Sequence, residues 1–248
     1  MKRQFGLSMI ELLIAMAISS FLILGVTQIF IDNKRNYLYQ QSQSENQENG
    51  RFTLMLLDRQ LAKTGYRRRP DDTLEQAFPA NTLNSCTFTA GQTITRVNDH
   101  TLCLRYQPRD PAELDCSGTG LSSANAASVA EPYTTPAQPF VETVTISGGN
   151  LTCNGAVLVE GVSGVVFEFG TGPTGEREVT SYTKTPGNAP IRSLRYSALL
   201  ESTQKNLAQG IASKACEQWE ALSGTDPCKE DRIYQIASSS TTLRNLMP

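Results

Sequence analysis

The chain has 248 residues and a formal net charge of −2. This length is typical of one or two domains and is sufficient to bury a sizeable core. The near-neutral charge argues against a nucleic-acid-binding protein, which needs a basic surface for phosphates, and the single histidine, His100, excludes metal sites built from several histidines.

The N-terminus joins a short basic segment to a long apolar one. Lys2 and Arg3 precede residues 7–31, in which Glu11 is the only charged residue. A helix of this length spans about 37 Å and can cross the hydrocarbon core of a bilayer. The positive-inside rule places its basic end in the cytoplasm. Residues 15–17 fit a secretory cleavage site poorly because a long apolar run follows them, so the simplest prediction is an uncleaved membrane anchor.

An anchor alone does not explain Glu11. A carboxylate inside a spanning helix costs roughly 3 kcal/mol and usually marks a partner or a function. A cut after Gly6 would place a new α-amino group on Leu7, about one helical turn from Glu11. The cation that pairs with Glu11 could then come from this chain or from a neighbouring subunit.

The segment from Gly6 to Glu11, with the apolar run behind it, resembles the class III leader of type IV pilins and type II secretion pseudopilins. The resemblance implies that prepilin peptidase cuts after Gly6 and methylates Leu7, and that Glu11 guides subunit docking. One departure is Phe5, which stands directly before Gly6 where a basic or polar residue is usual.

Residues 32–65 are predicted to continue the helix as its amphipathic half. Residues 40–49 are polar on all sides, which is typical of a solvated or subunit-contacting segment. An apolar stripe then follows at helical spacing and is expected to pack on a sheet; it consists of Leu54, Leu57 and Leu61, flanked by Phe52 and Met55.

The predicted helix ends near residue 65. Gly65 is placed as a C′ glycine, and Pro70 disfavours further extension. The basic run Arg67–Arg69 is interpreted as a solvated group of charges at the helix end rather than as a binding patch.

Residues 66–248 are predicted to form a β-rich globular domain, and a long helix followed by strands indicates an α+β fold. Residues 108–139 contain five prolines and are predicted to be a long loop or insertion. A second helix is predicted on the spacing of Leu207, Ile211, Ala215, Trp219 and Leu222. The expected strands are 93–97, 101–107, 141–147, 157–159, 165–169, 191–199 and 232–237.

Further segments are similar to PilW-type minor pilins when taken in order. They are residues 47–66, 158–169, 191–200 and 243–245, whereas residues 70–150 and 203–230 resemble that family weakly. This resemblance implies a type IV pilin-like fold: a long N-terminal helix, transmembrane in its first half, packed on an antiparallel sheet domain.

The same resemblance implies a non-enzymatic subunit that takes part in pilus assembly at or near the tip. Twitching motility, adhesion or DNA uptake would then depend on it through the pilus, without direct contact with nucleic acid. The implied partners are prepilin peptidase, other minor pilins, the major pilin and a large tip adhesin. The implied location is the inner membrane, with the C-terminal domain periplasmic, and after assembly the pilus on the cell surface.

Two other functions remain open at this point. The leader fits equally well a minor pseudopilin of type II secretion that is J-like in build. An uncleaved single-pass membrane protein with a periplasmic binding domain is the alternative from a different class.

All six cysteines follow the apolar segment, so they would lie in the periplasm, where disulfides persist. Six cysteines allow fifteen pairings. Local spacing favours Cys216–Cys228, and sequential pairing would then give Cys86–Cys103 and Cys116–Cys153. One or two pairs could instead be free buried thiols.

Three further patterns are weak, and we expect no catalytic residue, cofactor or metal. Residues 170–175 match G-x-G-x-x-G, but Pro173 removes an N–H and no apolar helix follows, as a dinucleotide site requires. His100 lies beside Asp99 in a turn-like context and is expected to be a surface histidine. The spacing of three acidic residues does not match an EF-hand loop; they are Asp226, Glu230 and Asp231.

Overall fold

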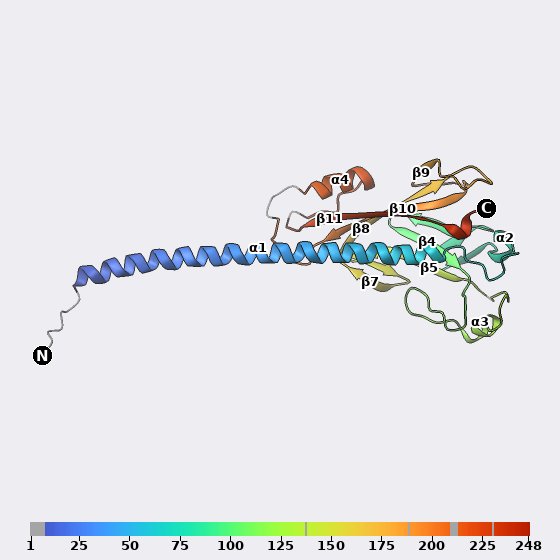
Figure 1. Ribbon diagram of the computed structural model, residues 1–248, viewed down its shortest axis with the longest axis horizontal. Helices are drawn as coiled ribbons and strands as arrows, with labels where there is room; N and C mark the ends of the chain where they lie inside the picture. The colour runs from blue at the N-terminus through green and yellow to red at the C-terminus, as the bar shows by residue number, and fades with distance from the viewer. Residues whose placement is uncertain (1–7, 137, 188, 209–212, 230) are drawn as a thin grey trace.

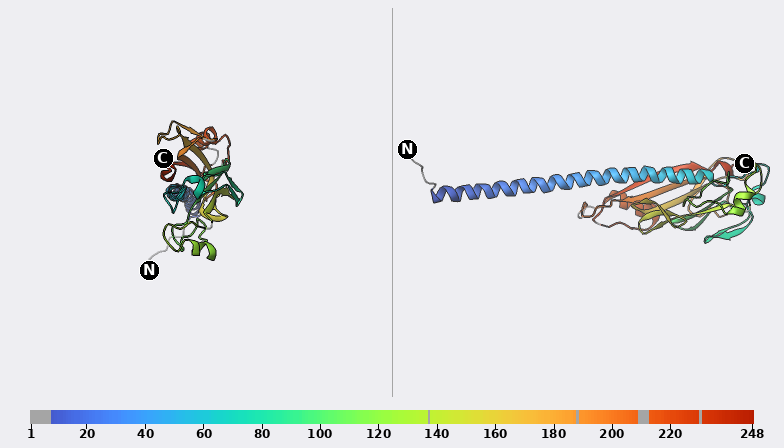
Figure 2. Two further views of the ribbon diagram at one scale, coloured as in Figure 1. Left: turned by 90° about the vertical axis from the view of Figure 1, so that its right-hand side faces the viewer. Right: turned by 90° about the horizontal axis from the view of Figure 1, so that it is seen from below.

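The computed structural model describes residues 8–136, 138–187, 189–208, 213–229 and 231–248. One long helix, α1 (Met9–Lys63), runs through the whole length of the molecule. Its first half projects alone, and its second half lies against a globular domain whose sheets follow one side of the helix (Figures 1 and 2). The long helix and the antiparallel sheets confirm the predicted α+β, pilin-like architecture.

The two ends of α1 carry residues that favour helix termini. Ser8 is the N-cap residue, and its side chain forms a capping box with Glu11. Lys63 is the last helical residue, and Gly65 follows with a left-handed φ of +74°. This confirms the prediction that Gly65 ends the helix as its C′ residue.

The strands form two larger antiparallel sheets and a short hairpin. The four-stranded sheet has the order β11-β10-β8-β9, and the five-stranded sheet has the order β3-β4-β5-β6-β7. The first contains β8 (Val162–Thr171), β9 (Ser181–Thr183), β10 (Ile191–Glu201) and β11 (Tyr234–Thr242). The second contains β3 (Ile94–Asn98), β4 (Thr101–Tyr106), β5 (Phe140–Ser147), β6 (Asn150–Cys153) and β7 (Ala156–Glu160). The hairpin joins β1 (Asn81–Leu83) to β2 (Cys86–Phe88).

The sequence patterns located most of this sheet structure. They predicted β3, β4, β5, β7, β8, β10 and β11, with ends that differ by a few residues. They missed β1, β2, β6 and β9, which are only three or four residues long. Such short strands show too little alternation to be recognised without their pairing partners.

The shorter helices correct two predictions. The second helix, α4 (Lys214–Ser223), is shorter than the predicted stripe, because Leu207 lies outside it; Ile211 lies outside the described residues. The insertion 108–139 contains a helix, α3 (Ser123–Ser128), which its proline-rich composition did not indicate. The remaining helical turns are α2 (Leu74–Ala77) and η1 (Arg244–Leu246).

The main core lies where the second half of α1 meets both sheets. Leu57 and Leu61 are buried, Leu54 is partly buried, and all three contact this core, which confirms the leucines of the predicted stripe. The flanking Phe52 and Met55 are exposed instead, because they lie off the face that the leucines turn to the sheets. Burying a leucine side chain contributes roughly 2 kcal/mol. The sheets supply their inward-facing side chains to the same core, among them Leu102, Leu104, Val144, Leu151, Val165, Phe167, Leu194 and Tyr196.

The polar segment 40–49 packs one face on the domain of its own chain and leaves the other face exposed, so the prediction of a solvated segment is correct for one face only. Ser42 and Asn46 are buried, and the Asn46 side-chain amide donates to the Ile233 carbonyl at 3.1 Å. Gly50 follows where the helix comes close to β11, since a Cβ atom added to Gly50 would lie 3.2 Å from the Cβ atom of Ala237. Small and polar residues on this face of the helix therefore permit close contact with the sheet edge.

The six cysteines form three disulfides: Cys86–Cys103, Cys116–Cys153 and Cys216–Cys228. These are the sequential pairs, and all six sulfur atoms are used. The first joins β2 to β4, the second joins the 108–139 insertion to β6, and the third joins α4 to the segment before β11. The first two disulfides therefore fix the hairpin and the insertion to the five-stranded sheet, and the third fixes α4 to the segment that leads into β11.

Candidate functional site at the two ends of the long helix

The first half of α1 exposes a large apolar surface. Its large hydrophobic side chains from Met9 to Ile31 are between 45% and 86% exposed. The helix is long and apolar enough to cross a membrane, and the segment that meets this test makes no contact with the globular domain. Isolated soluble chains rarely expose so large an apolar surface, so this half requires a bilayer or other apolar helices around it.

Two hydroxyl side chains within this apolar half are satisfied by the helix itself. The Ser20 hydroxyl donates to the Met16 carbonyl at 2.8 Å, and the Thr27 hydroxyl donates to the Ile23 carbonyl at 2.7 Å. Such bonds remove the cost of placing a hydroxyl in an apolar environment. Glu11 is thus the one charged group of the segment that still needs a partner of opposite charge.

Glu11 lies in the first turn of α1, and its carboxylate accepts a hydrogen bond from the Ser8 backbone N–H at 3.1 Å. The positive end of the helix dipole also favours a carboxylate at this position. Gly6 and Leu7, the predicted cleavage site and new N-terminus, lie outside the described residues. The structure therefore places Glu11 at the helix start and leaves its predicted docking partner open.

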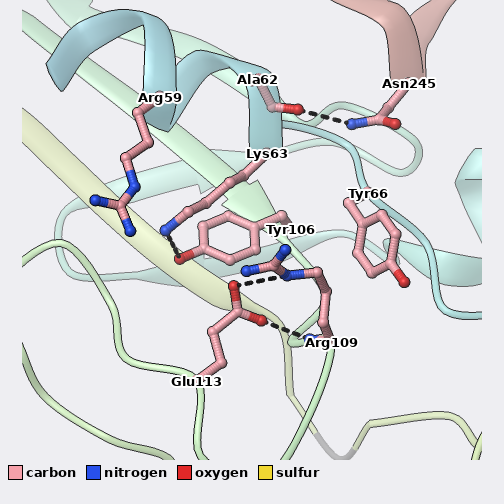
Figure 3. Close-up of a pocket in the computed structure, with 8 residues that line it drawn as sticks. All are labelled: Arg59, Ala62, Lys63, Tyr66, Tyr106, Arg109, Glu113 and Asn245. Carbon is pink, nitrogen blue, oxygen red and sulfur yellow. Dashed lines mark hydrogen bonds and ion pairs between the residues drawn. The ribbon is translucent and has the colours of Figure 1, made fainter. Parts of the chain in front are cut away.

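The other end of α1 forms one wall of a pocket of about 500 Å³. Figure 3 shows side chains converging here from the last turns of α1, from Tyr66 just after it, from β4, from the start of the 108–139 insertion and from η1. Asn245 of η1 closes the pocket by donating to the Ala62 and Thr64 carbonyls, both at 3.1 Å. The lining residues are Arg59, Ala62, Lys63, Tyr66, Tyr106, Arg109, Glu113 and Asn245.

A chain of hydrogen bonds leads from this pocket into the core. Lys63 donates to the Tyr106 hydroxyl at 3.4 Å, and Tyr106 donates to Glu142 at 2.7 Å (Figure 3 shows the first of these). Glu142 is fully buried and also accepts from the Cys116 backbone N–H at 2.8 Å. Burial raises the pKa of the Glu142 carboxyl above its ordinary value, partly offset by Tyr106 and the Lys63 charge.

Arg68 lies inside the domain, which corrects the prediction that the whole run 67–69 is solvated. Its side chain is 7% exposed. The guanidinium donates to backbone carbonyls at both ends of the insertion, namely those of Pro108, Arg109, Val129, Glu131 and Thr134. One arginine therefore holds the insertion closed and positions its first residues at the pocket.

A second buried arginine plays a similar part nearby. Arg105 on β4 donates to the Pro79 and Thr89 carbonyls, at 2.7 and 2.9 Å, and lies against the rings of Phe78 and Phe88. Burial lowers its pKa to about 10. Neither arginine can be recognised as an organising residue from the sequence, because Arg68 lies in a basic run typical of a solvated helix end and Arg105 has no pattern that distinguishes it from a surface charge.

The weak patterns noted in the sequence gain no functional partner. The His100 ring lies 3.0 Å from the Val165 carbonyl through Nδ1 and is partly exposed. Gly170 and Thr171 belong to β8, and the described residues 172–180 contain no helix that could hold a pyrophosphate. Asp226 accepts from the Cys228 backbone N–H at 2.9 Å, and Glu230 lies outside the described residues.

Comparison with known protein families identifies the prokaryotic N-terminal methylation motif over residues 1–27. No curated protein and no solved structure gave a significant match to the chain. The motif is a type IV pilin-like leader, and together with the α+β architecture it indicates a pilin-like or pseudopilin protein. Such a protein is a structural subunit that works with prepilin peptidase and other filament components, and its apolar helix anchors it in a membrane before assembly.

Proposed function

We propose that this protein is a minor pilin of PilW type that takes part in assembly of a type IV pilus, at or near its tip. The observation that carries the proposal is the single helix α1, whose first half is exposed and apolar behind a methylation leader and whose second half is built into a β-domain. The proposed partners are other minor pilins, the major pilin and a large tip adhesin. Twitching motility, adhesion or DNA uptake would depend on it through the pilus.

The proposed division of the chain follows the same logic. Residues 1–6 are the leader, residues 7–31 cross the inner membrane and later enter the filament core, and residues 32–65 carry the domain. Residues 66–248 form that domain in the periplasm before assembly and on the pilus surface afterwards.

The mechanism rests on neutralising two groups that are costly in lipid. Cleavage after Gly6 creates a methylated amine on Leu7, and Glu11 of one subunit pairs with the amine of its neighbour. In the uncut chain the Glu11 carboxylate is bound to the Ser8 N–H at 3.1 Å. Docking therefore exchanges this weak internal bond for an ion pair, which gains strength in a medium of low dielectric constant.

The first test is an in-frame deletion in the native host, with complementation. Surface pili are counted by electron microscopy, and secreted proteins are profiled in the same cultures. Loss of pili with normal secretion supports the minor-pilin proposal. Normal pili with lost secretion would instead make the protein a J-like minor pseudopilin of type II secretion, which the leader fits equally well.

The second test separates the charge of Glu11 from its capping role. Glu11→Gln keeps an oxygen that can accept from Ser8 but removes the charge, whereas Glu11→Ala removes both. Both variants should insert into the membrane, and both should fail to enter filaments. Normal incorporation of Glu11→Gln beside failure of Glu11→Ala would assign Glu11 to helix capping and contradict the docking mechanism.

The third test concerns processing. Mass spectrometry of the purified protein should find an N-terminal peptide that begins at methylated Leu7. A mature chain that still begins with residues 1–6 would favour an uncleaved single-pass membrane protein with a periplasmic binding domain.

A further inference from the structure

The pocket at the end of α1 has a surplus of positive charge. Arg59 and Lys63 stand one helical turn apart and both line it. Its one acidic residue, Glu113, is already engaged, since its carboxylate accepts from the Arg109 backbone N–H at 2.6 Å and lies 3.3 Å from Arg109 Nε. The charges of Arg59 and Lys63 are therefore not neutralised by Glu113.

Arg59 is the freer of the two cations, because it is exposed and has no hydrogen-bond or ion-pair partner among the described residues. Lys63 donates to the Tyr106 hydroxyl at 3.4 Å, lies over the Tyr106 ring and interacts with the Glu142 carboxylate behind it. Tyr66 is partly exposed and stands beside them, whereas Tyr106 is buried under Lys63 (Figure 3). The site thus offers a planar cationic fork, a point charge and one ring that can pack on an apolar neighbour of the anion.

We propose that this pocket binds a carboxylate-bearing segment of another polypeptide, with Arg59 and Lys63 holding the carboxylate and Tyr66 packing beside it. The pocket volume falls in the range that takes a few side chains. That the partner is a neighbouring filament subunit rests on the proposed function. The preference for a carboxylate rests on the pocket alone.

The position of the pocket favours a singly charged anion over phosphate. It lies at the last turn of α1, where the helix dipole places its negative end. Phosphate sites usually use backbone N–H groups at a helix N-terminus, and here the helix presents its C-terminus instead.

Arg68 acts on this site as a positioning residue. Its guanidinium donates to the carbonyls of Pro108 and Arg109, so it fixes the backbone from which Arg109 and Glu113 reach the pocket. The wall opposite α1 thereby keeps its place although it belongs to a long insertion.

The test uses the full-length chain in a nonionic detergent and ligand-observed NMR titrations. The probes are two capped peptides, acetyl-Gly-Glu-Tyr-amide and acetyl-Gly-Gln-Tyr-amide, with inorganic phosphate at matched ionic strength. We expect the glutamate peptide to bind about tenfold more tightly than the glutamine peptide, the size of one charge-assisted contact. Equal binding of the two peptides, absence of binding, or phosphate binding as tightly as the glutamate peptide would each overturn the proposal.

Matched variants locate the site. Arg59→Gln should weaken binding of the glutamate peptide about tenfold. Arg51→Gln removes an exposed charge from the same helix outside the pocket and should leave binding unchanged. Equal affinities of these two variants would overturn the proposal. The binding measurement needs no filament, so its result is independent of the deletion test. The pocket proposal can therefore fail while the minor-pilin proposal holds, and the pocket proposal can hold while the minor-pilin proposal fails.

Discussion

The insertion 108–139 should depend on Arg68, and Arg68→Lys is the change that tests this. Lysine keeps the positive charge but offers one compact ammonium in place of the guanidinium fork. In the structure that fork reaches five carbonyls on both arms of the insertion. A lysine cannot span them, so the two arms should separate.

The magnitude follows from which carbonyls water can reach. The bonds to Pro108 and Val129, at 3.2 Å each, are buried, whereas the other three are only partly buried. A buried acceptor left unsatisfied costs about 1–2 kcal/mol, and exposed carbonyls regain most of their energy from water. Arg68→Lys should therefore lower the free energy of unfolding by about 2–4 kcal/mol, a decrease in Tm of about 10 °C for a domain of this size.

Two readouts and one control make the test decisive. Thermal unfolding of the full chain in detergent gives the stability, and limited proteolysis reports cleavage within the insertion. Arg69→Gln is the control, because the Arg69 side chain is 42% exposed and its ion pairs with the described residues are those to Asp71 and Asp72, of a kind that contributes about 0–1 kcal/mol at a surface. Wild-type stability and protease resistance in Arg68→Lys would refute the role assigned to this arginine.

Three further predictions address the framework. Burial raises the pKa of the Glu142 carboxyl, so the folded chain holds that proton more tightly than the unfolded chain, and the free energy of unfolding falls as pH rises from 4.5 through the folded pKa. Glu142→Gln should make the free energy of unfolding less dependent on pH when it is measured from about pH 4 to 7.5. Parallel pH curves for the wild type and the variant would contradict this prediction. Replacing Cys216 and Cys228 together by serine removes a disulfide that joins residues 12 positions apart and should lower the free energy of unfolding, measured with denaturant, by about 3 kcal/mol. An unchanged free energy of unfolding would show that packing alone holds α4. Gly65→Ala should lower the free energy of unfolding by about 1–2 kcal/mol, because φ at this position is +74° and a Cβ atom would lie 2.6 Å from the Leu246 side chain. An unchanged Tm would show that the backbone of this turn adjusts without strain.

Periodic patterns made much of the fold predictable. The apolar run of residues 7–31, the stripe of Leu57 and Leu61, and the glycine at position 65 each act through neighbours within one or two helical turns. Alternation located the longer strands for the same reason. These signals are local, so they can be read from the sequence without knowing what packs on them.

The pocket and its supports could not be predicted because they depend on long-range contacts. Arg68 contacts carbonyls up to 66 residues away, and Asn46 contacts one 187 residues away. One local signal was present but unrecognised: Arg59 and Lys63 are four residues apart on one helix face, and Tyr66 follows just beyond the helix end. Polar residues at that spacing normally indicate a solvated face, and only the folded insertion turns it into a pocket.

The two ends of α1 are far apart but mechanically joined. The helix is continuous from Met9 to Lys63, so Glu11 and Arg59 are separated by about 70 Å along its axis. The second half cannot turn independently of the domain, because Asn46 bonds to the Ile233 carbonyl, Asp58 accepts from Tyr196 at 2.6 Å, and the leucine stripe is buried in the core. Docking of the apolar half against neighbouring helices would therefore also fix the direction in which the distant pocket faces. A subunit that pairs with Glu11 need not be the one that reaches the pocket, so a charge change at Arg59 should alter contacts between domains while leaving membrane insertion intact.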